Sequence, residues 1–246
     1  MKRRTYLGAS GLGGLSALSG CLDSFSSVTG DEPEPADGAV LGPPDREHDL
    51  SASAHPTYGD EVPSYSVPDA LSGETVSDED FLGERVQLHT FVYTNCIMGA
   101  CPALLRYLIE VNDGVREAGY RDEAAFAPWT FDPKRDTPDV LRTYLTDRNV
   151  DPSADDWHFL RPETQEAAHE LLFDQQGGPF GLPVEQAPAS EIAPEGTDSD
   201  VEYGFTHFVL ILLVNDQGIV ERSYPGATER STPMDIEDDM LAVIEG

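Results

Sequence analysis

The chain has 246 residues, and its 46 acidic side chains outnumber the 15 basic ones, which gives a formal net charge of −31 at pH 7. Such a chain offers no basic face for phosphate groups, so nucleic acid is excluded as a partner. The acids are spread along the whole sequence, and their repulsion is strongly screened only in concentrated salt, where the Debye length falls to about 3 Å at 1 M. The composition therefore predicts a halophilic protein.

Residues 1–21 predict an export signal with a site for lipid attachment. Lys2, Arg3 and Arg4 precede a glycine-rich apolar stretch that is too short for a transmembrane helix. The adjacent arginines resemble a twin-arginine signal, and the sequence Leu-Ser-Gly-Cys21 resembles a lipobox. We expect a lipidated Cys21 that anchors the protein to the outer face of the cytoplasmic membrane. An ordinary secretory signal with an incidental Cys21 is the alternative.

The remainder divides into a linker and one domain. Residues 22–60 are rich in Ser, Pro, Gly and acidic residues, with almost no apolar periodicity. This composition is typical of a flexible, disordered tether. Residues 61–246 are numerous enough for one domain with a sizeable core.

Strand and helix patterns alternate along this domain. Apolar, β-branched or aromatic runs predict strands at 65–67, 86–93, 124–131, 157–160, 205–214 and 219–223. Helices are predicted at 77–82, 103–115, 137–149, 162–173 and 233–244, with a hairpin turn at 215–218 and a long loop at 182–203. Strand–helix–strand followed by a hairpin and a helix is the order of a thioredoxin-like α/β domain, so we expect a central mixed sheet flanked by helices.

Cys96 and Cys101 are the thiols that remain after Cys21. They lie between the end of the strand predicted at 86–93 and the start of a helix, where Pro102 suits the first helical position and places Cys101 at the N-cap. Unpaired N–H groups and the positive end of the helix dipole favour a thiolate there, which indicates metal binding or thiol reactivity. A buried disulfide or two inert thiols are the alternatives.

Several motifs in order resemble one known family. They are Tyr93-Thr-Asn-Cys96 with Cys101-Pro102, the string Asp132-Pro-Lys-Arg-Asp136-Thr-Pro138, Trp157-His-Phe-Leu160, and Phe205-Thr-His207. Over about residues 65–246 the chain resembles the Sco/SenC family of copper-binding, thioredoxin-fold proteins. The resemblance implies that Cys96, Cys101 and His207 are copper ligands. With its signal, the chain resembles a haloarchaeal-type exported lipoprotein of that family.

The chemistry of these residue types agrees with copper. Two thiolates and one imidazole suit Cu(I), and they tolerate Cu(II) when a further oxygen or sulfur approaches. Zinc more often takes a fourth protein ligand. The alternative for His207 is a strand-end residue that is satisfied by its surroundings. We assign none of the other histidines to a metal, and these are His48, His55, His89, His158 and His169.

The spacer between the cysteines departs from the family pattern. The family usually has three residues there, whereas this chain has four, Ile97 to Ala100. We expect Gly99 to absorb the extra residue. The extra residue can also bring the thioether of Met98 near the metal, and the alternative is an exposed or locally packed loop residue.

Asp132 and Asp136 flank the Pro-Lys-Arg turn. The resemblance implies that they tune the copper site from outside the ligand set, or serve as transient ligands. Asp132 is the better candidate because it lies at the strand end on the cysteine side. Asp136 can instead cap the helix that begins near Thr137.

The resemblance implies a copper metallochaperone that delivers copper to the dinuclear copper-site subunit of a membrane-bound cytochrome c oxidase. A thiol–disulfide oxidoreductase that keeps the cysteines of that subunit reduced is the second possibility. Thioredoxin-like reductants commonly carry a cis-proline opposite their cysteines, but Phe205-Thr-His207 has no proline and offers a ligand. A peroxiredoxin-type peroxidase is rejected because its Thr-x-x-Cys signature is missing.

Overall fold

The computed structural model describes residues 35–44, 50, 52–173, 177–193 and 201–246. The predicted export signal and Cys21 lie outside these residues. Within the described part of the chain, we find no helix with the length and hydropathy that a membrane span requires.

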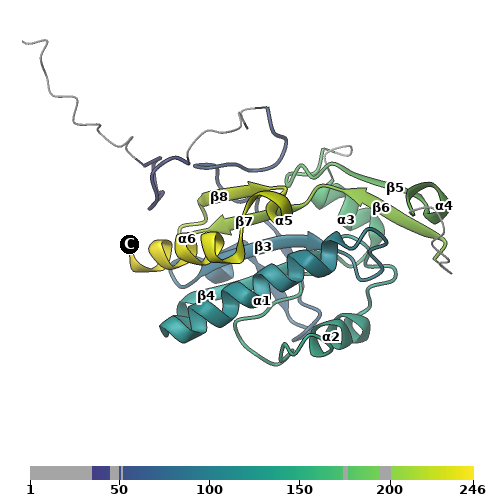
Figure 1. Ribbon diagram of the computed structural model, residues 1–246, viewed down its shortest axis with the longest axis horizontal. Coiled ribbons are helices and arrows are strands. Elements are labelled where there is room, and N and C mark those ends of the chain that lie inside the picture. Colours follow the sequence, from purple (N-terminus) through teal and green to yellow (C-terminus); the bar gives the residue numbers. More distant parts are fainter. Residues whose placement is uncertain (1–34, 45–49, 51, 174–176, 194–200) are drawn as a thin grey trace, which may run out of the picture. The chain divides into compact units, whose positions relative to one another are not determined.

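A four-stranded mixed sheet forms the centre of the domain (Figure 1), with the order β4–β3–β7–β8. Its strands are β3 (Val86–Val92), β4 (Ala124–Thr130), β7 (Leu210–Val214) and β8 (Val220–Pro225). β3 runs parallel to β4 and antiparallel to β7, and β7 and β8 form a hairpin. Every residue of β3, β4 and β7 is buried, because both faces of the sheet are covered.

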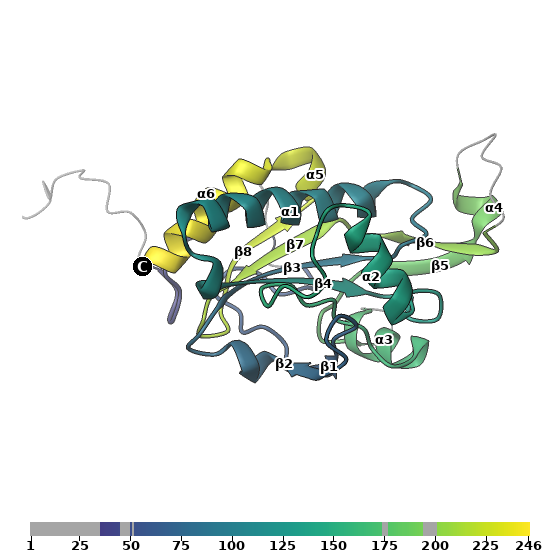
Figure 2. The same cartoon turned by 90° about the horizontal axis from the view of Figure 1, so that it is seen from below.

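Helices and small strands cover the two faces (Figure 2). On one face lie α1 (Ala100–Ala118), α5 (Ala227–Arg230) and α6 (Pro233–Glu245); on the other lie β1 (Ser66–Pro68), β2 (Thr75–Ser77) and α3 (Gln165–Leu172). Further short elements include α2 (Pro138–Thr146) and the 3₁₀ turns η1 (Asp78–Phe81) and η2 (Arg121–Glu123). Helix α1 buries Leu104, Leu108 and Val111 completely, as its helical spacing of apolar residues requires. The expected mixed sheet with flanking helices is confirmed.

The strand predicted at 205–214 is two strands. β6 (Tyr203–His207) ends before Phe208 and Val209, and β7 begins at Leu210. Between them the chain is held by a hydrogen bond from the Gly226 N–H to the Val209 carbonyl (2.8 Å). β6 extends beyond the central sheet (Figure 2) and pairs with another segment.

That partner lies in the stretch predicted as a long loop. Residues 182–203 contain β5 (Val184–Pro188) and α4 (Ala189–Ile192), and β5 pairs with β6 antiparallel. The pairing satisfies backbone groups of β6 that cannot reach the central sheet. Residues 157–160 were predicted as a strand, but within them only isolated bridges form, from Trp157 to Phe126 and from Leu160 to Asp69 and Trp129.

Residues 35–44 and 52–60 do not behave as a free tether. Val40 and Leu41 donate their N–H groups to the Glu221 carboxylate (2.7 and 2.9 Å), and Asn215 donates to the Gly38 carbonyl (2.8 Å). The Gly59 N–H donates to the Val220 carbonyl (2.9 Å). Because these backbone groups pair with a fully buried carboxylate and with the sheet edge, the described part of the predicted tether belongs to the packed domain.

Candidate metal centre

The cysteine loop joins β3 to α1. Gly99 has φ of 76° and is the N-cap of α1, so the helix begins at Ala100. This left-handed conformation is available to glycine without strain, and Gly99 thus accommodates the four-residue spacer as expected. The expectation that Cys101 is the N-cap is wrong, because Cys101 is the second residue of the helix. Its N–H, one of the unpaired groups of the first turn, donates to Cys96 Sγ (3.4 Å).

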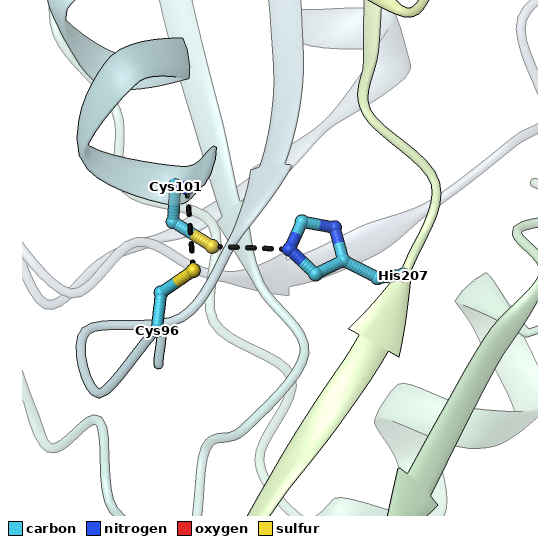
Figure 3. A group of neighbouring side chains, drawn as sticks. All are labelled: Cys96, Cys101 and His207. Carbon is cyan, nitrogen blue, oxygen red and sulfur yellow. Dashed lines mark hydrogen bonds between the residues drawn. The ribbon is translucent and has the colours of Figure 1, made fainter. Parts of the chain in front are cut away.

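His207 approaches from the end of β6 (Figure 3). Its Nδ1 lies 3.2 Å from the carbonyl oxygen of Phe208, and a carbonyl only accepts, so Nδ1 carries the proton. The lone pair of Nε2 therefore faces Cys101 Sγ at 3.2 Å. The ring packs edge-on against Tyr93 and tilted against Phe131, with centroids 5.9 and 5.0 Å away.

Cys96, Cys101 and His207 each direct one ligand atom into a common space, and these atoms all lie within 4.8 Å of one another. Cys101 is fully buried, whereas Cys96 and His207 are half-buried, so the group is open on one side. The two thiols are free. Among the described residues, no further histidine, cysteine or carboxylate joins this group.

The two thiols differ in acidity. A hydrogen bond from the Cys101 thiol is the largest cause that lowers the pKa of Cys96, to about 4. Burial raises the pKa of Cys101 well above its usual range. The expectation that the helix start favours a thiolate at Cys101 is therefore wrong, because this thiol is buried and shares its proton with Cys96, while its own N–H donates to the sulfur of Cys96.

The arrangement fits a soft cation. The Cys101 thiol has one proton for two neighbouring acceptors, the Cys96 sulfur and the His207 Nε2 atom. A cation between the three atoms would accept one lone pair from each of them at once. Two sulfurs and one imidazole nitrogen suit Cu(I), and the absence of a fourth ligand among the described residues fits zinc less well.

Asp136 supports the strand end that leads to Cys96. Its fully buried carboxylate accepts hydrogen bonds from the Thr94 N–H (3.2 Å), from the Thr94 hydroxyl, and from the Thr130 hydroxyl (2.6 Å). Burial raises the pKa of Asp136 to about 6. The alternative that Asp136 caps α2 is wrong: the N-cap is Thr137, whose hydroxyl accepts from the Val140 N–H.

Asp132 supports the strand that leads to His207. Its carboxylate pairs with the Arg135 guanidinium and accepts from the Tyr203 hydroxyl (3.0 Å). Arg135 also donates to the Tyr203 carbonyl (2.8 Å) and stacks 3.8 Å from the centroid of its ring. Tyr203 is the first residue of β6. Neither aspartate belongs to the ligand group, and each contacts a segment that carries a ligand.

Sequence reasoning missed several of these supporting residues, chiefly Tyr93, Thr94 and Tyr203. The Tyr93 hydroxyl lies 3.3 Å from the Phe205 nitrogen and 3.4 Å from its carbonyl oxygen, which joins the cysteine strand to β6. The position of Tyr93 three residues before Cys96 was a signal, but the residue that it contacts, Phe205, is 112 residues away. The structure places Met98 on the loop as a 61% exposed side chain.

Known proteins resemble this chain in sequence and structure. The family model SCO1/SenC matches residues 59–242. Copper-bound ScoI of Bradyrhizobium japonicum is 20% identical with a TM-score of 0.56, over 75% of this chain and 99% of that one. Copper-bound ScoI of Arabidopsis thaliana is 16% identical with a TM-score of 0.57, over 76% and 99%.

A third solved structure, BsSco, is described as a member of the Sco family of cytochrome c oxidase assembly proteins with a disulfide switch. It is 24% identical with a TM-score of 0.52, over 75% of this chain and 93% of that one. These likenesses confirm the thioredoxin-like fold. No curated protein gave a significant match. Because the family model covers most of its length, the chain belongs to the SCO1/SenC family.

Proposed function

We propose that this protein is a copper metallochaperone that carries copper to the copper-site subunit of a cytochrome c oxidase. The observation that carries the proposal is the convergence of Cys96, Cys101 and His207 within 4.8 Å. The copper-bound relatives and the description of BsSco as an oxidase assembly protein support it. Copper is the cargo of this protein, either as Cu(I) or as Cu(II).

The burial of the three residues suggests how cargo is received and released. Cys101 is enclosed, while Cys96 and His207 lie at the open side. Uptake displaces the proton of Cys101, which leaves two thiolates and the His207 lone pair as ligands. Thiolates and imidazoles of the acceptor can approach from the open side and replace the ligands one at a time, without any change in copper oxidation state.

Copper titration of matched variants tests this function. The reduced protein should bind about one Cu(I) in competition with a chelator, and Cys96→Ala, Cys101→Ala and His207→Ala should each weaken binding severely, by about 100-fold or more, because two ligands cannot complete the site. His158→Ala is a suitable control, because His158 packs against Phe81 outside the ligand group. Unchanged copper affinity in His207→Ala would defeat the metallochaperone proposal.

The acidity of Cys96 favours a second function, thiol–disulfide exchange with the oxidase subunit. A thiolate is the attacking species, and the pKa of Cys96 is lowered to about 4. Cys96 would attack a disulfide of the acceptor to form a mixed disulfide. Cys101 would then attack Cys96, which releases the reduced acceptor and leaves the pair oxidised. In a disulfide-reduction assay, this function requires both cysteines and tolerates His207→Ala.

We further propose that the protein is exported and held at the outer face of the cytoplasmic membrane by a lipidated Cys21. The lipobox-like sequence before Cys21 supports this location. Cys21→Ala should release the protein from the membrane fraction, because one cysteine would carry all the lipid. Retention of that variant in washed membranes would contradict the proposed anchor.

A further inference from the structure

His55 is buried in the domain although it lies outside the part of the chain that the family model matches, residues 59–242. Its side chain is 6% exposed, and its Nδ1 donates to the Pro56 carbonyl (2.9 Å). The proposed copper site makes no use of this histidine. The ring nevertheless lies beside Phe208, the residue that follows His207.

The imidazole of His55 stacks on Phe208. The two ring centroids are 5.7 Å apart, with an angle of 26° between the ring planes. Phe208 follows His207 directly, and its carbonyl oxygen is the acceptor for His207 Nδ1 (3.2 Å). Phe208 and Val209 lie outside both β6 and β7, so no strand pairing fixes the Phe208 peptide.

Two further observations show how the N-terminal segment is packed near Phe208. Gly181 has φ of 59°, and a Cβ atom there would lie 2.0 Å from the Ala54 carbonyl oxygen. The backbone next to His55 therefore passes so close to Gly181 that a side chain would displace it. From the same segment, Leu50 lines a cavity of about 410 Å³ together with His207 and Phe208.

We propose that His55 is a positioning residue of the metal centre: its ring packs on the ring of Phe208 and thereby keeps in place the Phe208 carbonyl, which fixes the tautomer of His207. A proton on Nδ1 leaves Nε2 free to bind a metal, so a displaced carbonyl removes the preference for the binding tautomer. The inference deepens the proposed function, on which its copper measurements rest. It also means that the segment between the predicted lipid anchor and the domain contacts Phe208, the residue next to the ligand His207.

The tautomer of His207 can be measured without any metal. In the reduced, metal-free protein at about pH 8, above the usual pKa of histidine, nitrogen chemical shifts of the imidazole distinguish the two tautomers. Wild type should show the Nδ1–H form, and His55→Ala should show a mixture. His55→Phe, which keeps a ring over Phe208, should restore the wild-type pattern.

Copper affinity supplies a second readout. His55→Ala should weaken Cu(I) binding about tenfold, the low end of the range for partners that orient a ligand, and His55→Phe should recover most of the loss. Gly181→Ala displaces the backbone of Ala54 and His55 without altering the His55 side chain, and it should reproduce the effect of His55→Ala. His158→Ala serves as a control for general loss of stability and should leave the tautomer of His207 unchanged.

The outcomes separate this inference from the proposed function. Wild-type protein that binds no copper would defeat the metallochaperone, while the metal-free tautomer measurement would still decide the role of His55. If wild type binds copper and His55→Ala keeps both the wild-type tautomer and the wild-type affinity, the positioning role is overturned. The same holds if His55→Phe behaves like His55→Ala, because the stacked ring would then be irrelevant.

Discussion

The two ends of the central sheet differ in how far the protein itself satisfies their buried acceptor atoms. At the end where Val214 aligns with Gln87, the buried Glu221 carboxylate accepts from the N–H groups of Val40 and Leu41 and from the Asn215 amide (2.6 Å). At the other end, where β3 leads to Cys96, three ligand atoms converge within 4.8 Å, and the Cys101 thiol has one proton for two neighbouring acceptors. The carboxylate at the first end receives its hydrogen bonds from the protein itself, whereas the three ligand atoms at the second end can still bind a cation.

The difference explains how one fold combines a fixed frame with a reactive site. Buried polar groups that have all their partners stabilise one conformation. Ligand atoms that share a proton can exchange it for a metal ion, provided that neighbouring segments hold them in place. Asp136 and Asp132 supply that support from outside the ligand group.

The largest effect on stability is expected from Glu221→Ala. This change leaves three donors without their acceptor, and each unpaired buried group costs about 1–3 kcal/mol. Since the Val40 and Leu41 backbone is half-buried, we expect a loss of about 3 kcal/mol in the free energy of unfolding, measured by urea denaturation in concentrated salt. Copper affinity should stay within about twofold of wild type, because Glu221 lies at the opposite end of the sheet. A parallel loss of copper affinity would show that the two ends are coupled.

A smaller, pH-dependent effect on the free energy of unfolding is expected from Asp136→Asn, at the end of the sheet where β3 leads to Cys96. The pKa of Asp136 is raised to about 6 by burial, so the folded protein binds this proton more tightly than the unfolded chain. Stability contributed by this group is therefore lost as pH rises from about 4 to about 6. At about 1.4 kcal/mol per pKa unit, the loss reaches about 2–3 kcal/mol. The asparagine variant should lack it, which urea denaturation at about pH 4 and about pH 7 can measure.

Asp156→Asn provides a control with the opposite sign. Burial opposes the ionised form of Asp156, but hydrogen bonds from Arg116 and Asn112 outweigh it and lower the pKa of Asp156. This carboxylate therefore stabilises the fold above the usual pKa of an aspartate, and its removal should lower stability at about pH 7. If Asp136→Asn and Asp156→Asn alter the pH dependence of stability in the same direction, the opposite pKa shifts assigned to these two carboxylates are incorrect.

Local sequence patterns were sufficient to predict the strand and the helix at the centre of the domain, β3 and α1. The apolar run of β3 predicts a strand because burial on both faces requires apolar residues. The helical spacing of Leu104, Leu108 and Val111 predicts a helix because burial along one stripe requires apolar residues at that spacing. The pairing of β5 with β6 left no such trace, because five residues of mixed polarity gain strand geometry from a partner and not from their own composition.

The candidate site shows the same division. Cys96, Cys101 and His207 were named from motifs, and the structure brings them together. The roles of the aspartates depended on long-range contacts: Asp136 bonds to Thr94 across 42 residues and Asp132 to Tyr203 across 71. The buried position of His55 cannot be predicted from its surroundings in the sequence, because a stretch of acidic and small residues gives no pattern that marks the few side chains a domain buries.

The smallest effect, on copper affinity, is expected from Met98→Ala. This variant tests whether the longer cysteine loop adds a ligand to the group of Cys96, Cys101 and His207. Met98 is 61% exposed, and an exposed side chain loses little when it is truncated. We expect less than a threefold change in Cu(I) affinity, since the three converging atoms already form a soft ligand set. Met234→Ala, at a 68% exposed methionine on α6, is the matched control. A loss of tenfold or more in Met98→Ala alone, which is about 1.4 kcal/mol, would mean that the thioether completes the site and that the longer spacer serves copper binding directly.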